Sequence, residues 1–416
     1  MRFARGLVAL LVSCGVAGVV VPDAGGATPP LPPSKDRFYR YTGHEPLARI
    51  PPGTVLKRRA VQVVFGPIST PVAAEQLLYR TRDELGEPSV TVTTVIAPTA
   101  APVRLIGYLS FYDGLDPRCD PSYALAGGVP PGSANQQQAE EEDLLMSWYL
   151  DHGFALTVPD FEGTGLHWMA GRESGYNTLD AIRATESYLR VPATTKVGLS
   201  GYSGGAVAAD WATELASAYA PSVNLVGVAM GGVPVNYLHM FDYINGTDEF
   251  SAAIPGMLLG LARAYHVDLS RYLSAYGAKA VAEEQGTCIA SDFGHFPGLT
   301  YQRLLRPAYR GLRRSVLARM LARQTMGSGG TRPRIPMLIG VGNVDGKGDG
   351  VMAAADVRAL AEHYCRGGAP VDYEEYRGAQ HQYAGAFFEP ATAAFFQARF
   401  AGLPYVDSCA TARGPF

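Results

Sequence analysis

Apolar runs and helical patterns alternate along most of the chain. Short runs rich in Val, Ile and Leu, each leading into a loop, predict strands at residues 61–64, 90–96, 104–111, 155–159, 195–199, 224–230, 336–341 and 371–376. Between them, apolar residues recur at helical spacing, most clearly at residues 140–151, 179–189 and 206–219. This alternation predicts an α/β fold, in which helices cover both faces of a mostly parallel sheet.

Residues 235–333 interrupt this alternation. The stretch has helical periodicity, many aromatic residues and no convincing strand, and it lies between two predicted strands. We therefore expect a helical insertion, or lid, over the carboxyl edge of the sheet, where open α/β sheets bind ligands. Its apolar side chains suit a lid that closes on a hydrophobic substrate, and they equally suit a packing layer that gates nothing. The main ones are Phe241, Tyr243, Phe250, Met257, Leu258, Leu259 and Leu261.

The first 27 residues have the pattern of a signal peptide. Arg2 and Arg5 precede an apolar run over residues 6–21, and small residues follow up to Ala27. The run is short for a membrane span, so we expect export and cleavage after Ala27, which leaves a domain of residues 28–416. A lipobox-like sequence ending at Cys14 gives the alternative, a lipoprotein of the cell envelope.

Composition narrows the functional classes. The 416 residues are 47% hydrophobic and 18% charged, with a formal net charge of −3 and no long basic or acidic run. This is enough apolar material for one large core. Nothing in the charge pattern predicts binding to nucleic acid or to an anionic membrane surface.

Cysteine usage supports export. Once Cys14 leaves with the signal segment, Cys119, Cys288, Cys365 and Cys409 remain. An even number in an exported chain predicts two disulfides with three possible pairings, and buried free thiols are the alternative. No two of these cysteines lie close enough in the sequence for a zinc site, and we expect no metal.

The sequence Gly201-Tyr202-Ser203-Gly204-Gly205 matches the Gly-x-Ser-x-Gly pattern of a serine nucleophile. In a chain with 48 glycines the pattern alone is weak, and a glycine-rich turn with a solvated serine is the alternative. The setting is stronger, because a strand-like run precedes the motif and a helical run follows it. Strand, sharp turn and helix form a nucleophile elbow, in which Ser203 projects from the sheet edge and the N–H of Gly204 faces an oxyanion.

His381 is the candidate base. A serine hydroxyl needs a base, and in proteins with a nucleophile elbow the chain order is serine, acid, histidine. His381 follows the last predicted strand, in a loop at the expected sheet edge, whereas the other histidines after Ser203 fall in the insertion or on a predicted helix. A structural histidine is the alternative.

Two carboxylates compete for the role of the acid that orients this histidine. Both lie in the glycine-rich loop after the strand at 336–341, where Asp345 is nearer the strand and Asp349 precedes the next helix. Asp349 could instead cap that helix. A calcium loop does not fit, because the ligand spacing is wrong and no terminal glutamate follows. The loop sequence leaves the choice between the two open.

The loop after the strand at 104–111 carries the candidate second oxyanion donor. It reads Phe111-Tyr112-Asp113-Gly114, and the backbone N–H of Asp113 would join that of Gly204 around an oxyanion. An ordinary turn residue is the alternative for Asp113.

Several segments together resemble the bacterial secretory lipases, the group that includes the yeast lipase A type, within the α/β-hydrolase superfamily. The matching segments are Tyr112-Asp113 with residues 119–123, then residues 158–163, 201–205 and 231–234, and the terminal pattern from His381 to Cys409. They run through most of the chain from residue 112 onward, and jointly they are specific.

The resemblance implies a triad of Ser203, Asp349 and His381, because the spacing from Asp349 to the Tyr364-Cys365 pair looks like the family's acid-to-cysteine spacing. The chain departs from the family in having Val351-Met352 where Val-Pro is usual. It also carries an extra Gly-Lys-Gly in the same loop, which puts the choice of Asp349 over Asp345 in doubt.

The resemblance also implies disulfides Cys119–Cys288 and Cys365–Cys409, and a helical lid between residues 233 and 334. Members of the family hydrolyse acylglycerols and simpler carboxylic esters. We therefore expect a secreted, monomeric ester hydrolase that needs no cofactor and contacts lipid interfaces transiently. An acyltransferase of the cell envelope with the same nucleophile, and an inactive surface binding protein on the same fold, are the alternatives.

Overall fold

The structure is a computed structural model, and it describes residues 29–63, 71–99, 103–312 and 315–410. The predicted signal segment and Cys14 lie outside these residues. Within the described ranges, no helix is long and apolar enough to cross a membrane.

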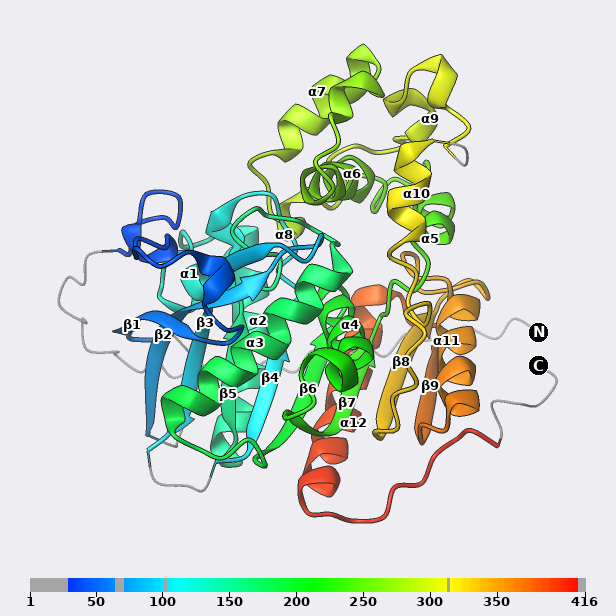
Figure 1. Ribbon diagram of the computed structural model, residues 1–416. Helices are drawn as coiled ribbons and strands as arrows, with labels where there is room; N and C mark the ends of the chain where they lie inside the picture. Colours follow the sequence, from blue (N-terminus) through cyan, green and yellow to red (C-terminus); the bar gives the residue numbers. More distant parts are fainter. Residues whose placement is uncertain (1–28, 64–70, 100–102, 313–314, 411–416) are drawn as a thin grey trace, which may run out of the picture.

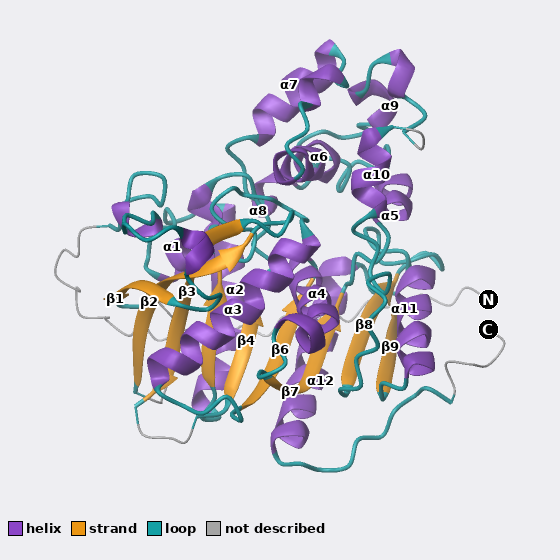
Figure 2. Ribbon diagram, viewed as in Figure 1, coloured by secondary structure: helices purple, strands orange, loops and turns teal. Residues whose placement is uncertain are grey.

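Nine strands form one sheet in the order β1-β2-β3-β5-β4-β6-β7-β8-β9 (Figures 1 and 2). The pairs from β1 to β5 in this order are antiparallel, and the pairs from β5 to β9 are parallel. The prediction of a mostly parallel sheet is therefore confirmed. The strands are β1 Val55–Ala60, β2 Val72–Arg82, β3 Pro88–Pro98, β4 Leu105–Leu109, β5 Ala155–Pro159, β6 Lys196–Tyr202, β7 Asn224–Gly231, β8 Met337–Asn343 and β9 Val371–Arg377.

The edge of the sheet near the N-terminus differs from the prediction. The strand expected at residues 61–64 is wrong, because β1 ends at residue 60, residues 61–63 belong to no strand, and residue 64 is not described. The apolar pattern also misses β2, in which polar residues occupy buried positions. Gln76 and Arg80 are buried there, and their side chains donate hydrogen bonds to the carbonyl oxygens of Ser122 and Leu47. Such internal partners let a strand bury polar side chains that break its apolar pattern.

Helices cover both faces of the sheet, as predicted. Helices α3, α4 and α11 pack on one face in the larger apolar core, and α2 and α12 pack on the other with aromatic residues such as Phe388 and Phe396. The short helix α1 lies near the antiparallel edge, against β3 and β5. These helices are α1 Pro121–Leu125, α2 Ala134–Asp151, α3 Gly171–Leu189, α4 Gly204–Tyr219, α11 Ala354–Gly367 and α12 His381–Phe400.

Between β7 and β8 the chain leaves the sheet and forms a helical insertion (residues 235–333). In Figure 1 its helices, green to yellow, stand beyond the carboxyl ends of the parallel strands. The described part of this insertion contains helices and loops and no strand of the sheet. Its helices are α5 Tyr237–Ile244, α6 Ala253–Ala264, α7 Ala275–Glu284, α8 Ile289–Asp292, α9 Tyr301–Leu304 and α10 Val316–Ala322.

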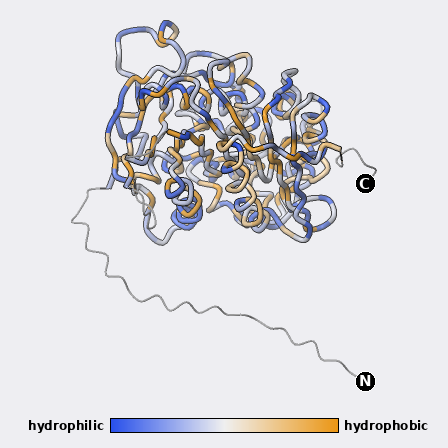
Figure 3. The backbone as a smooth tube through the Cα atoms, turned by 90° about the horizontal axis from the view of Figure 1, so that it is seen from below, coloured by the Kyte–Doolittle hydropathy of each residue, from blue (hydrophilic) through white to orange (hydrophobic). Residues whose placement is uncertain are grey.

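Two disulfides join distant parts of the chain. Cys119 bonds to Cys288 across 169 residues, and Cys365 bonds to Cys409 across 44 residues. This is the pairing that the family resemblance implies. The first disulfide connects the helical insertion to the loop after β4, and the second fastens the C-terminal segment to α11. Figure 3 shows hydrophilic stretches concentrated on the outer loops, with the more apolar stretches running inside.

Candidate active site

Ser203 occupies a sharp turn between β6 and α4. Its backbone has φ +53° and ψ −119°, a conformation that costs energy for a residue with a side chain. The Ser203 N–H donates to the carbonyl of Gly231 on the neighbouring strand β7, which secures the turn (2.9 Å). The strand, turn and helix form the nucleophile elbow that the sequence motif predicts.

The flanking glycines are required by close backbone approach. A Cβ at Gly201 would lie 2.3 Å from the carbonyl oxygen of Gly205, and a Cβ at Gly205 would lie 2.0 Å from the carbonyl oxygen of Leu109. Any side chain at either position would force strand β6, helix α4 and the end of β4 apart. The glycines therefore permit the tight turn that presents Ser203.

The structure brings Ser203, His381 and Asp349 together at the carboxyl ends of three different strands. Nε2 of His381 lies 2.9 Å from Oγ of Ser203, and Nδ1 of His381 lies 2.8 Å from Oδ2 of Asp349. The Asp349 side chain is fully buried, and the exposed fraction of His381 is 6%. A continuous hydrogen-bonded path thus runs from a buried carboxylate through the imidazole to the serine hydroxyl.

The loop after β8 separates the two competing aspartates. Oδ1 of Asp349 accepts hydrogen bonds from the N–H groups of Val351 and Met352, which leaves Oδ2 for His381. Asp349 does not cap α11, whose N-cap is Ala353. Asp345 is exposed, and its carboxylate accepts from backbone N–H groups two and three residues later in its own turn. The geometry therefore places Asp349 against the histidine and Asp345 at the surface.

Tyr202, next to the serine, also holds the histidine. Its hydroxyl donates a hydrogen bond to the backbone carbonyl of His381 (2.6 Å), and its ring lies 5.2 Å from the imidazole. Gly232 contributes space, because a Cβ there would lie 2.7 Å from Cε1 of His381. The sequence motif did not indicate this role for Tyr202. The only feature of the sequence that could have indicated this role is the position of Tyr202 directly before the nucleophile.

Asp113 lies beside the elbow, as the sequence predicts. A Cβ at Gly204 would lie 1.9 Å from Oδ1 of Asp113, so the aspartate packs directly on the start of α4. Gly204 is the first residue of α4, and its N–H has no acceptor within that helix. Both residues line the same cavity as Ser203 and His381. Asp113 and Gly204 therefore lie beside the serine, and their N–H groups stay candidate oxyanion donors.

Asp113 forms a buried acid pair with Glu162, which follows β5. Burial raises the pKa of Asp113 to about 7, although hydrogen bonding with the Trp168 and Glu162 side chains offsets part of this effect. Burial and the charge of Asp113 raise the pKa of Glu162 well above its ordinary value. Oε2 of Glu162 accepts a hydrogen bond from the N–H of Gly114 (3.2 Å). The pair therefore holds a proton near neutral pH beside the candidate oxyanion donor.

Another buried carboxyl, that of Glu142 on α2, holds the start of the loop after β4, which carries Asp113. It accepts hydrogen bonds from the Ser110 hydroxyl (2.7 Å) and the Phe111 N–H (3.1 Å). Burial raises the pKa of Glu142 to about 8. Neither Glu142 nor Glu162 was singled out from the sequence. Burial of an ionisable group needs a specific partner, and that partner becomes visible only in the folded protein.

The cavity at Ser203 is small and mostly apolar. It encloses about 50 Å³ between the elbow and the helical insertion. Pockets for drug-sized ligands have volumes of roughly 300–1,000 Å³, so the insertion covers Ser203 closely in this structure. The apolar residues that line the cavity are Trp168, Met169, Pro234, Met240, Ile244, Phe250, Ala252, Ala253, Met257, Ile289, Phe293, Val351 and Met352.

A parallel sheet with an elbow serine, followed in chain order by an aspartate and a histidine, defines the α/β-hydrolase class. Comparison with known families is specific. The secretory lipase family matches residues 131–408, and the chain belongs to this family.

Relatives that match most of the chain include proteins named as lipases and one named as an esterase. Lipase 10 of Candida albicans is 31% identical over 400 residues, which is 91% of this chain and 83% of that protein. The trichothecene C-3 esterase of Fusarium sporotrichioides is 31% identical and covers 88% of this chain and 83% of its own. The probable inactive lipase MT1628 of Mycobacterium tuberculosis is 34% identical, with 91% and 84% covered. Family membership therefore does not determine which ester is the substrate or whether the protein is active. Both questions depend on the residues of the site.

The fold agrees with a solved structure of the family. Candida antarctica lipase A in its closed state superposes with a TM-score of 0.83 at 27% identity, covering 91% of this chain and 89% of that one. The recognition of a secretory lipase on an α/β-hydrolase fold is confirmed.

Proposed function

We propose that this protein is a secreted serine hydrolase that cleaves carboxylic esters, with acylglycerols as its principal substrate class. The observation that carries the proposal is the hydrogen-bonded path from Asp349 through His381 to Ser203. Membership of the secretory lipase family and two disulfides support an exported enzyme.

Acylation begins at Ser203. Nε2 of His381 takes the hydroxyl proton as Oγ bonds to the ester carbonyl carbon, and the carbonyl oxygen becomes an oxyanion held by the N–H groups of Asp113 and Gly204. The imidazolium then gives its proton to the alkoxide oxygen while the bond from carbon to that oxygen breaks. The alcohol leaves, and the acyl group remains on Ser203.

Deacylation repeats these steps with water. Nε2 of His381 takes a proton from a water molecule as the water oxygen attacks the acyl carbon. The imidazolium then gives this proton to Oγ of Ser203 as the bond between Oγ and the acyl carbon breaks. Asp349 stays ionised throughout, orients the imidazole through Nδ1 and stabilises its positive charge. The serine proton leaves with the alcohol and a proton from water replaces it, so Ser203 and His381 end the cycle in the protonation states in which they began it.

The helical insertion supports a hydrophobic substrate and a gating role. Its apolar residues line most of the cavity over Ser203, and the volume of about 50 Å³ is too small for an acyl chain and its alcohol together. We therefore expect the insertion to move away from Ser203 when substrate enters. An apolar lid face exposed by this motion would favour transient contact with a lipid interface.

A fluorophosphonate probe and an ester series test the proposal. We expect a covalent adduct on Ser203 that is absent in Ser203→Ala, and hydrolysis rates that rise with acyl length and at an oil interface. The absence of an adduct on Ser203 would favour an inactive binding protein. The relative from Mycobacterium tuberculosis is named as a probable inactive lipase. If a glycerol or sugar acceptor is acylated faster than free acid appears, the protein is an acyltransferase.

A further inference from the structure

Three potential metal ligands converge in the helical insertion, and one of them, Asp292, also lines the cavity over Ser203. They are Glu284 at the end of α7, Asp292 at the end of α8, and His295 in the following loop. One ligand atom from each lies within 4.8 Å of the others. Among the described residues, this is the cluster of three or more acidic, histidine or cysteine side chains that could hold an ion. The sequence predicts no metal site, because the cysteine spacing matches no zinc site and the loop at residues 342–350 does not fit calcium.

The two carboxylates are buried and incompletely paired. The exposed fraction is 0% for Glu284 and 1% for Asp292. No donor of the described chain reaches Oε1 of Glu284 or Oδ1 of Asp292, but the two carboxyls hydrogen-bond to each other, and Oε2 of Glu284 accepts from the Thr287 hydroxyl (3.0 Å). No lysine or arginine of the described chain forms an ion pair with either carboxylate. Two buried carboxyls in contact cannot both carry a charge unless a proton or a cation lies between them, and a metal ion can replace that proton.

We propose that Glu284, Asp292 and His295 bind one divalent transition-metal ion such as Zn²⁺ or Mn²⁺. Two carboxylate oxygens and one imidazole nitrogen suit these ions, whereas Ca²⁺ takes six to eight oxygen ligands. Three protein ligands leave further positions for water. His295 is exposed, which gives the ion a path from solvent.

The distances fit an ion after a small adjustment. Ligand atoms around a tetrahedral ion with bonds of about 2.1 Å lie roughly 3.4 Å apart, so atoms that lie within 4.8 Å of one another must approach by up to roughly 1.4 Å. His295 can supply this movement, because its ring is exposed and packs on Phe296 at the surface (ring centroids 4.4 Å apart).

Electrostatics around the cluster favour a positive ligand. Burial, followed by the charges of Asp292 and Glu283, raises the pKa of Glu284 to about 9. Burial raises the pKa of Asp292 to about 6, and hydrogen bonds with the Glu284 and Thr287 side chains, followed by the charge of His295, offset part of the rise. Without a cation, the two carboxyls therefore hold a proton at neutral pH. A bound metal ion displaces that proton, so binding releases protons to the buffer.

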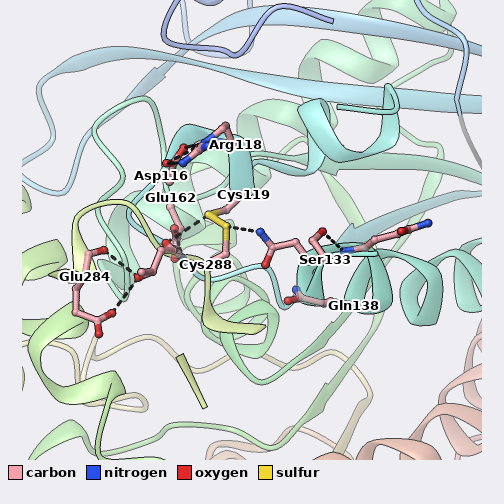
Figure 4. Close-up of a disulfide and its surroundings, with 12 residues drawn as sticks. Asp116, Arg118, Cys119, Ser133, Gln138, Glu162, Glu284 and Cys288 are labelled. Atoms are coloured by element: carbon pink, nitrogen blue, oxygen red, sulfur yellow. Dashed lines mark hydrogen bonds and ion pairs between the residues drawn. A yellow bond between two sulfur atoms is a disulfide. The ribbon is translucent and has the colours of Figure 1, made fainter. Parts of the chain in front are cut away.

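The cluster brackets a segment that contacts the oxyanion loop. Between Glu284 and Asp292, the carbonyl of Thr287 accepts from the N–H of Leu115 (3.1 Å), and the N–H of Ile289 donates to the carbonyl of Asp113 (2.9 Å). Cys288 of the same segment forms the disulfide with Cys119. Figure 4 shows Glu284 near this disulfide. A metal ion that joins Glu284 to Asp292 would fix both ends of the segment that supports Asp113. Metal binding itself does not depend on the proposed function, but this consequence does.

The test is metal binding to the full mature chain after treatment with a chelator. Titration calorimetry with ZnCl₂, MnCl₂ and CaCl₂ should give one site for Zn²⁺ or Mn²⁺, and no binding of Ca²⁺ at the same concentrations. At a hundredfold excess over Kd, thermal unfolding should shift upward by roughly 3 °C. The same titration on Ser203→Ala separates the outcome from that of the proposed function, because metal binding should be unchanged there.

Variants decide where the ion binds. His295→Gln changes an exposed residue and should weaken binding by at least about tenfold without unfolding the protein, and Asp292→Asn should weaken it similarly. The control His44→Gln changes another exposed histidine, outside the insertion, and should bind like the unmodified chain. Absence of binding by either metal up to millimolar concentration overturns the proposal. So does a binding constant that both cluster variants leave unchanged.

Discussion

His381 is held by Asp349 at two points. The backbone N–H of His381 donates to the backbone carbonyl of Asp349 (2.9 Å), and the ring Nδ1 bonds to the carboxylate of the same residue (2.8 Å). The two residues lie far apart in the chain. Asp349 is in the loop after β8, and His381 is the first residue of α12. This double contact fixes both the position and the tautomer of the imidazole.

The double contact predicts which aspartate matters. Asp349→Asn should lower kcat by roughly 10³–10⁴-fold, because an amide stabilises the wrong tautomer and carries no charge to offset the imidazolium. Asp345→Asn, in the same loop but at the surface, should leave kcat within about twofold. Steady-state hydrolysis of a soluble ester measures both. A larger loss in Asp345→Asn would assign the acid to that residue.

Tyr202→Phe should reduce stability more than catalysis. The change removes the buried hydrogen bond to the carbonyl of His381 and leaves that carbonyl without the hydroxyl donor. We expect a loss of about 1–2 kcal/mol in the free energy of unfolding, measured with urea, and a change in kcat below about tenfold. Tyr41→Phe is the matched control, because its hydroxyl makes an exposed bond to the carbonyl of Glu45 and should matter little. Equal losses in the two variants would contradict the role of burial.

The Asp113 carboxyl should make stability fall with rising pH. Its pKa in the folded protein, about 7, lies above the unfolded value, so its contribution is complete below about pH 4 and is lost as pH rises through 7. In Asp113→Asn this loss disappears, and the variant should gain stability relative to the parent between pH 5 and pH 8. Urea unfolding at several pH values measures the difference. The exposed change Asp345→Asn should leave the parent's pH profile between these values intact.

The two disulfides should differ in their effect on catalysis. Removing Cys119–Cys288 or Cys365–Cys409 by paired serine substitutions should lower the unfolding free energy by up to about 5 and about 4 kcal/mol, from the loop lengths of 169 and 44 residues. The first pair also anchors the loop that carries Asp113, so only its removal should lower kcat beyond what stability explains. Measuring kcat well below each variant's unfolding temperature separates the two effects. Equal losses of kcat would mean that the Cys119–Cys288 bond has no special role.

Local sequence carried most of the information about the sheet and the elbow. The strands from β4 to β8 have mostly apolar runs because helices bury them, and burial on both faces needs apolar residues at successive positions. The apolar pattern did not predict strand β2, because polar residues occupy some of its buried positions. Its buried Gln76 and Arg80 find hydrogen-bond partners far along the chain, at Ser122 and Leu47, which a pattern of neighbours cannot reveal.

The sequence by itself determined the parts of the site that depend on consecutive residues. Gly201 to Gly205 specify a strained turn between one strand and one helix, and chain order then indicates His381. The family resemblance favours Asp349 over Asp345, but only the tertiary structure gives the physical reason, which is the approach of two loops after neighbouring strands β8 and β9. It alone also brought Glu284, Asp292 and His295 together. Side chains separated in sequence form a site through packing, and the apolar pattern that drives packing does not record which polar groups it will bury side by side.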